Sequence, residues 1–266
     1  MTATETPTLM VFAISHYCEK ARWALDRLGI AYKVRTLPAG VHVAVLRRAG
    51  ALRSTVPALV LSDGTVVQGS SEIIDWAEAE AAAGRGNGTA LTPLARGVDG
   101  AAIERRIGEV AATNVRRWYY SDALFEAPGQ VRSLFMRDLQ GPERVLMRLG
   151  WPALRRLMIV GLKLDHAGGR AAHRVLDAEL DWLDGLLAGG ETFSDPASGA
   201  LTRLDITAAA LIAPLVLPVH HPVYGDMPRT KQVAADLDAW AERPIVRWCH
   251  EIYANARHTD QFSAAA

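Results

Sequence analysis

The residues with the clearest chemical potential lie at positions 15 and 18, directly after an apolar run. Leu9 to Ile14 has the length and composition of a buried strand, and a helical pattern begins at Tyr17. Ser15 and Cys18 therefore lie where a strand passes into the first turn of a helix. Unpaired backbone N–H groups and the positive end of the helix dipole meet there, and both stabilise a thiolate. The segment predicts a site for sulfur chemistry.

The residues that follow indicate a β-α-β unit. Between positions 17 and 28 the apolar residues recur with helical spacing, and Gly29 stands where a C-terminal cap belongs. Ile30, Tyr32 and Val34 then alternate with less apolar residues, which predicts a second strand. Because a helix joins the two strands, we expect them to be parallel.

A hairpin and a second helix complete this pattern. Residues 58–61 and 65–67 have the composition of strands and flank Asp63-Gly64, a dipeptide that favours a tight turn between antiparallel strands. The sheet is therefore predicted to be mixed. Ser70 precedes an apolar-periodic run with an acidic first turn, so it is the predicted N-cap of the next helix.

A glycine-rich stretch at 83–89 marks a change in organisation. Strand-like and helix-like segments alternate before it, whereas helical periodicity dominates after it. We predict an α/β domain over residues 8–83 and an all-helical domain over residues 99–258.

One helix of the second region has a clear start signal. Thr202 and Asp205 have the spacing of a capping box, which predicts a core helix from 206 to 217. Pro214 is expected to kink or end that helix. Cys249 shares a helical face with apolar residues and is predicted to be a core residue.

Composition excludes several classes of protein. The chain has 266 residues, 50% of them apolar, and 29 basic against 29 acidic side chains, so no nucleic-acid partner is expected. Its two distant cysteines argue against a disulfide framework and favour a cytoplasmic location. No apolar run approaches the roughly 20 residues of a membrane span. His220 and His221 lack further ligands nearby, so no metal is predicted.

The order of the N-terminal elements is that of a thioredoxin-like domain, and four motifs make nearly the whole chain resemble the glutathione transferase superfamily. The motifs are Ser15-His16-Tyr17-Cys18-Glu19-Lys20-Ala21-Arg22-Trp23-Ala24-Leu25, Thr55-Val56-Pro57, Gly69-Ser70-Ser71-Glu72-Ile73 and Leu201-Thr202-Arg203-Leu204-Asp205-Ile206. The resemblance implies a thioredoxin-like domain with a mixed sheet, followed by a helical-bundle domain. It also implies a cytoplasmic homodimer that uses glutathione in detoxification.

Within the first motif, the resemblance implies that Ser15 donates a hydrogen bond to the sulfur of glutathione and that Tyr17 belongs to the same binding site. The activated sulfur would attack a small apolar electrophile. Two alternatives stay open. Cys18 could carry glutathione-dependent thiol transfer or reduction, or the fold could belong to a non-catalytic binding or scaffold protein. His16, in the loop, is expected to be exposed to solvent.

The second and third motifs imply the rest of the glutathione site. Val56 would pair its backbone with the cysteinyl unit because Pro57 is cis in the family, and Ser70 with Ser71 would bind the γ-glutamyl carboxylate. Gly69 departs from the family, which commonly has an acidic residue there. The γ-glutamyl ammonium then needs another partner, such as Gln68 or Glu72, or the thiol is not glutathione.

Overall fold

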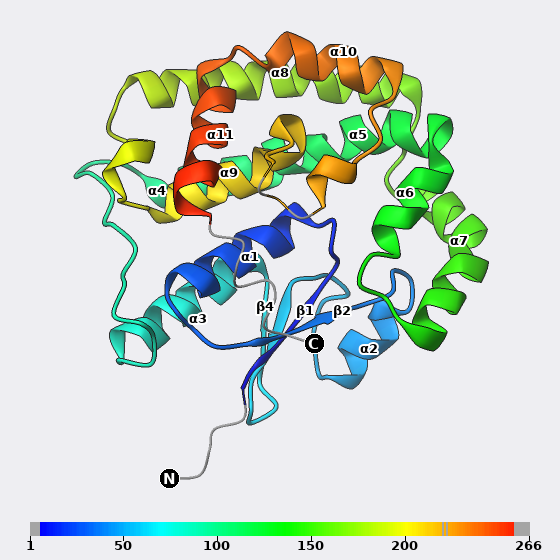
Figure 1. Cartoon of the computed structure of the whole chain (residues 1–266), viewed down its shortest axis with the longest axis horizontal. Helices are drawn as coiled ribbons and strands as arrows, with labels where there is room; N and C mark the ends of the chain where they lie inside the picture. The colour runs from blue at the N-terminus through cyan, green and yellow to red at the C-terminus, as the bar shows by residue number, and fades with distance from the viewer. Residues whose placement is uncertain (1–5, 220, 222, 258–266) are drawn as a thin grey trace. The chain divides into compact units, whose positions relative to one another are not determined.

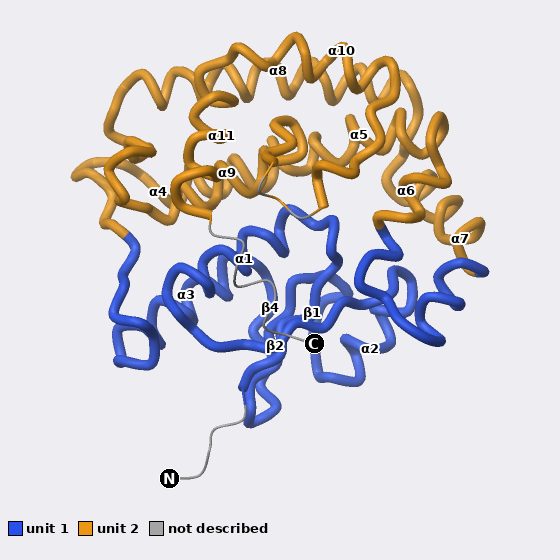
Figure 2. Tube along the Cα trace, viewed as in Figure 1, with its two compact units in different colours: residues 1–91, 135–149, 260–266 blue, residues 92–134, 150–259 orange. Residues whose placement is uncertain are grey.

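The computed structural model describes residues 6–219, 221 and 223–257. These residues form two compact units (Figure 2). Among the described residues, unit 1 contains 6–91 and 135–149, and unit 2 contains 92–134 and those between 150 and 257. The domain limits expected from the sequence, 8–83 and 99–258, stay predictions. His220, half of the adjacent histidine pair, lies outside the described residues.

Unit 1 is built on a four-stranded sheet with the order β2-β1-β3-β4 (Figure 1). The strands are β1 (Thr8–Val11), β2 (Lys33–Thr36), β3 (Ala58–Val60) and β4 (Val66–Gln68). β1 is parallel to β2, with Leu9 opposite Val34, and antiparallel to β3; β3 and β4 form the predicted antiparallel hairpin. The prediction of a mixed sheet is confirmed.

The second strand starts later than the alternation at Ile30 predicts. Ile30 still belongs to the end of the preceding helix, because its N–H donates to the carbonyl of Leu25 at 3.0 Å while the N–H of Gly29 donates to Asp26 at 3.1 Å. These two bonds form a Schellman motif around Gly29, whose φ is +66°. Strand pairing begins only at Lys33, whose N–H donates to the carbonyl of Pro7 at 2.8 Å.

Three helices flank the sheet: α1 (His16–Arg27), α2 (His42–Arg48) and α3 (Ser70–Ala82). Met10 and Ala58 pack with Leu46 of α2 on one face. Side chains alternate along a strand, so Leu9 and Val11 point to the opposite face, where α1 and α3 pack against each other (Figure 1). β1 is therefore buried on both faces.

The remaining helices build most of unit 2, and the C-terminal region is mostly helical as predicted. In chain order they are α4 (Gly100–Arg106), the π-helical turn η1 (Ile107–Ala111), α5 (Ala112–Glu126), α6 (Pro128–Phe135), α7 (Gly141–Gly161), α8 (His166–Ala188), the 3₁₀ turn η2 (Pro196–Ser198), α9 (Arg203–Val216), the 3₁₀ turn η3 (Tyr224–Asp226), α10 (Lys231–Trp240) and α11 (Pro244–Ala256). Within the described ranges, no helix is both long and apolar enough to span a membrane.

α9 is the core helix of unit 2, since every residue from Leu204 to Val216 is buried. Its capping box is confirmed: the Thr202 hydroxyl accepts from the N–H of Asp205 at 3.0 Å, and the Asp205 carboxylate accepts from the N–H of Thr202 at 2.6 Å. The helix continues through Pro214 instead of ending there. Cys249 is fully buried, as its helical face predicts.

Candidate functional site

Ser15 caps α1 at the end of the loop that leaves β1. Its N–H donates to the carbonyl of Phe12 at 3.1 Å, and its Oγ accepts from the N–H of Cys18 at 3.3 Å. The side chain is half-buried. A hydroxyl that accepts from a backbone N–H still has its own hydrogen to donate. Ser15 can therefore cap the helix and donate a hydrogen bond to a bound sulfur at the same time.

Cys18 lies in the first turn of α1 and is 1% exposed. Burial raises the pKa of its thiol to about 11, although the hydrogen bond with Ser15 and the backbone at Phe12 act in the opposite direction. The folded protein therefore holds Cys18 as a neutral thiol at physiological pH. Disulfide exchange needs an accessible thiolate, which this environment disfavours.

The state of Cys18 predicts its chemical reactivity. At pH 8, a thiol with a pKa of about 11 is roughly 0.1% ionised, compared with roughly 10% at the ordinary value of 9.0. We expect iodoacetamide to alkylate Cys18 at least about 100-fold more slowly in the native protein than in urea, as measured by mass spectrometry of the peptides. Buried Cys249 serves as the control. Rapid native alkylation of Cys18 alone would support the thiol-transfer alternative instead.

His16 is buried, so the expectation that it faces solvent is wrong. Only 4% of its surface is exposed, and its ring centroid lies 4.5 Å from that of half-buried Tyr17. Lys20 is also buried and donates from Nζ to the Ser71 hydroxyl at 3.0 Å. This contact links the N-terminal half of α1 to the first turn of α3, so the structure brings the first and third motifs together.

The Val56–Pro57 peptide bond is cis, as the resemblance implies. The Pro57 carbonyl accepts from the N–H of Gly69 at 3.1 Å, which connects this turn to the start of α3. Among the hydrogen bonds within the described residues, none uses the backbone N–H or carbonyl of Val56. The second motif thus leaves the backbone N–H and carbonyl of Val56 available beside the third motif.

Gln68 supports this turn from β4, a role that the sequence did not predict. Its side chain is buried; Oε1 accepts from the N–H of Arg53 at 2.8 Å, and Nε2 donates to the carbonyls of Thr55, at 2.9 Å, and of Arg53. These bonds hold the loop that leads to Pro57. Since the side-chain amide is used in this way, Gln68 is a positioning residue and a poor partner for an ammonium group.

Gly69, not Ser70, is the N-cap of α3, so the predicted cap is wrong by one residue. Gly69 has φ +118°, a conformation that side chains disfavour. The space that a Cβ would take is already occupied by the carboxylate of Glu72. Glu72 in turn pairs with the Arg53 guanidinium at 2.8 Å. An acidic group therefore lies beside position 69 after all, provided by the third helical residue.

Replacing Gly69 with alanine should destabilise the protein by about 2 kcal/mol, because the new Cβ is strained at this φ and must displace Glu72. Urea unfolding measures the change. Gly84→Ala is the matched control: its φ is +78°, but nothing lies within 4 Å of the added carbon. Its loss should be clearly smaller, and equal losses would show that the Glu72 contact contributes nothing.

Ser15, Cys18 and the two motifs around positions 56 and 70 thus lie in one unit with the architecture of a thioredoxin-like domain. Residues 9–86 match the model of the glutathione S-transferase N-terminal domain. This part of the chain therefore belongs to the family of glutathione S-transferase N-terminal domains.

Solved structures share the fold over nearly the whole chain. Glutathione transferase GSTFuA2 from Phanerochaete chrysosporium is 16% identical, covers 96% of this chain and 98% of its own, and has a TM-score of 0.58. The enzyme CsGST63524 of Ceriporiopsis subvermispora, solved in complex with glutathione, is 16% identical, with 98% and 99% covered and a TM-score of 0.56. The β-etherase LigF from Sphingobium sp. strain SYK-6 is 17% identical, with 92% and 99% covered and a TM-score of 0.52. No curated protein sequence matches significantly.

Proposed function

We propose that this protein binds glutathione in unit 1 and activates its thiol for transfer to a small apolar electrophile. The observation that carries the proposal is the Ser15 hydroxyl, held at the N-terminus of α1 with its hydrogen available. The similarly folded protein from Ceriporiopsis subvermispora, whose structure contains glutathione, supports the choice of thiol.

Ser15 is the residue that we assign to activation. A hydrogen bond from its hydroxyl favours the thiolate over the thiol, as does the helix dipole. Lowering a thiol pKa from about 8.5 to about 6.5 raises the ionised fraction at pH 7 from about 3% to about 75%, equivalent to about 2.7 kcal/mol. The nucleophile is then the sulfur of glutathione. Cys18 remains a buried neutral neighbour in this account.

The rest of glutathione is assigned by its chemistry. The backbone of Val56, which precedes cis Pro57, pairs with the cysteinyl unit. The N-terminus of α3 at Ser70 and Ser71 receives the γ-glutamyl carboxylate, since helix N-termini bind anions. Glu72 replaces the acidic residue that position 69 lacks and binds the ammonium group. Tyr17, half-buried beside His16, completes the site.

Calorimetric titration with reduced glutathione tests this assignment. We expect binding in the millimolar range or tighter, and Glu72→Gln should weaken it about tenfold by removing the carboxylate that pairs with the ammonium group. The matched control is Glu80→Gln. Glu80 also lies on α3, and its carboxylate also pairs with an arginine, Arg85. Absence of heat at millimolar glutathione would contradict both enzyme hypotheses, conjugation through Ser15 and thiol transfer through Cys18. It would favour the alternative of a non-catalytic binding or scaffold protein.

Homodimer formation, a cytoplasmic location and a role in detoxification belong to the same proposal. Light scattering of the purified chain tests the first of these, with a mass of twice the monomer as the expected result. A monomer at micromolar concentration would contradict it.

A further inference from the structure

The helix α7 carries a row of aliphatic side chains that the rest of the chain does not cover. Among the described residues, eight large apolar side chains are exposed to solvent, and five of them lie on α7. These five are each at least half exposed: Val145, Leu146, Leu149, Leu157 and Val160. With 3.6 residues per turn, they fall within about 120° of one another around the helix axis. They form one continuous apolar surface, which we call the outer face of α7.

The opposite face of α7 is also apolar, and it is buried. Met147 and Trp151 are 3% and 5% exposed. On the same side of the helix, Arg155 donates from Nε to the carbonyl of Leu124 at 2.8 Å, which attaches the second half of α7 to α5. A surface helix normally has one apolar face and turns it to the core. Because α7 has two, its packing within the chain does not account for the outer face.

The charges beside the outer face are almost all positive. Residues 141–163 include five basic side chains and one acidic side chain, a net charge of +4 in a protein whose total is zero. Arg148, Arg156 and Lys163 are exposed. None of the ion pairs among the described residues involves any of these three. Their charges are therefore available to an anionic partner.

The outer face offers few groups for directional recognition by another protein. α7 contains no hydroxyl or amide side chain, and its one aromatic residue, Trp151, is buried. Protein interfaces depend on exposed aromatic anchors and direct hydrogen bonds. A second copy of the chain also fits poorly. If two α7 helices packed antiparallel around Ala153, Arg148 of one copy would lie within a turn of Arg156 of the other, and the like charges would repel.

We propose that α7 binds the surface of a membrane that contains anionic lipids. The helix lies in the plane of the interface, and its outer face enters the boundary between head groups and acyl chains. Arg148, Arg156 and Lys163 reach the lipid phosphates, since long basic side chains can lie along an apolar layer while their charged ends stay in water. The contact is peripheral and requires no spanning segment. It does not depend on the proposed binding of glutathione.

Sedimentation of the full chain with lipid vesicles tests the proposal. We expect binding to vesicles of phosphatidylglycerol, and binding at least about tenfold weaker to vesicles of phosphatidylcholine. The double variant Leu149→Gln, Leu157→Gln removes the most exposed large side chain from each half of the outer face and should weaken binding at least about tenfold. Arg148→Gln, Arg156→Gln should weaken it by a similar factor. All four side chains are exposed, so both variants should stay folded, and circular dichroism checks this.

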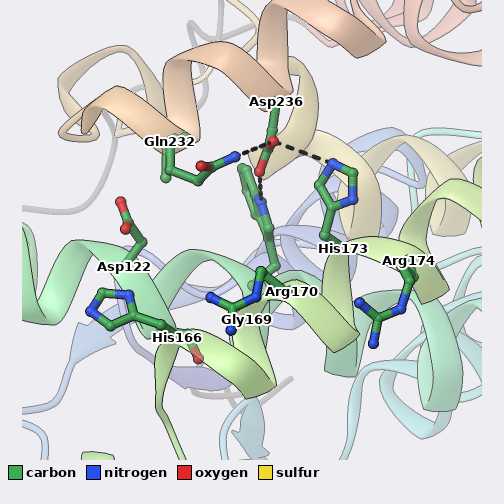
Figure 3. A pocket seen from close by; sticks show the side chains of 11 residues that line it. Asp122, His166, Gly169, Arg170, His173, Arg174, Gln232 and Asp236 are labelled. Atoms are coloured by element: carbon green, nitrogen blue, oxygen red, sulfur yellow. Dashed lines mark hydrogen bonds and ion pairs between the residues drawn. The ribbon is translucent and has the colours of Figure 1, made fainter.

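Two matched controls remove the same kinds of side chain from other places. Leu52→Gln, Val219→Gln removes two aliphatic side chains that are 99% and 88% exposed and lie outside α7. Arg170→Gln, Arg174→Gln removes two exposed arginines from α8, where they line a cavity together with the carboxylate of Asp236 (Figure 3). Each control should leave binding to phosphatidylglycerol vesicles unchanged within about twofold.

Three results would overturn the proposal. The first is that the unmodified protein does not bind phosphatidylglycerol vesicles. The second is that the α7 variants and their controls lose binding equally, because the total charge or the total exposed apolar area would then be responsible. The third is a fall in the molecular mass of Leu149→Gln, Leu157→Gln in light scattering, which would show that the outer face joins two copies of the chain.

Discussion

Replacing Ser15 with alanine is expected to lower kcat/KM for conjugation of glutathione to 1-chloro-2,4-dinitrobenzene about 25-fold at pH 7. The loss follows from the fall in the ionised fraction of the bound thiol from about 75% to about 3% at this pH. The variant also loses the N-cap of α1, where the Ser15 hydroxyl accepts from Cys18, at a cost of about 1 kcal/mol in stability. It should therefore remain folded, and circular dichroism checks this.

Two companion variants separate activation from other roles of this segment. Ser15→Thr keeps a hydroxyl that can cap and donate, so it should retain most of the activity. Cys18→Ser should retain conjugation, because the thiol is buried and neutral. At saturating glutathione, the midpoint of the pH profile of kcat/KM for the electrophile should rise by about 2 units in Ser15→Ala only. Full activity of Ser15→Ala together with an inactive Cys18→Ser would reverse the assignment.

Asp205→Ala should destabilise the protein by about 4 kcal/mol, a larger effect on stability than that of any other substitution considered for this chain. Asp205 is fully buried, and its two carboxylate oxygens accept from the N–H groups of Thr202 at 2.6 Å and Ser194 at 2.9 Å. Removing the carboxylate leaves both donors without their acceptor, and each such loss costs about 1–3 kcal/mol. The start of the core helix α9 then lacks half of its capping box. Urea unfolding followed by fluorescence measures the change.

Asp195→Ala is the control for this prediction. Asp195 also caps a helical turn, accepting from the N–H of Ala197 at 2.9 Å, but the contact is exposed. Water can replace it, so the expected loss is below about 1 kcal/mol. If Asp205→Ala unfolds at the same urea concentration as the unmodified protein, the capping box does not stabilise α9.

Features that depend on neighbouring residues in the chain could be predicted from the sequence. The Asp63-Gly64 hairpin and the capping box at Thr202 and Asp205 are set by local spacing, and the structure confirms both. The predicted ends of helices and strands were wrong by one to three residues where two local sequence signals competed. Ser70 resembles an N-cap, but Gly69 adopts the φ that the turn requires. The alternation that starts at Ile30 overlaps the Schellman motif that ends α1.

Contacts between segments far apart in the chain could not be predicted in this way. Gln68 holds the loop before Pro57 through backbone groups 13 and 15 residues away. Burial of His16 and Cys18 likewise depends on how the elements pack. Such effects determine which of the candidate residues is chemically competent, so Ser15 and Cys18 could not be separated from the sequence alone.

The most direct test of the account is the pKa of the glutathione thiol in the bound state, measured by thiolate absorbance near 240 nm across a pH titration. We predict a pKa of about 6.5 in the unmodified protein and about 8.5 when Ser15→Ala binds the same ligand. A value near 8.5 in the unmodified protein, or the same lowered value in both proteins, would contradict activation of the sulfur by Ser15.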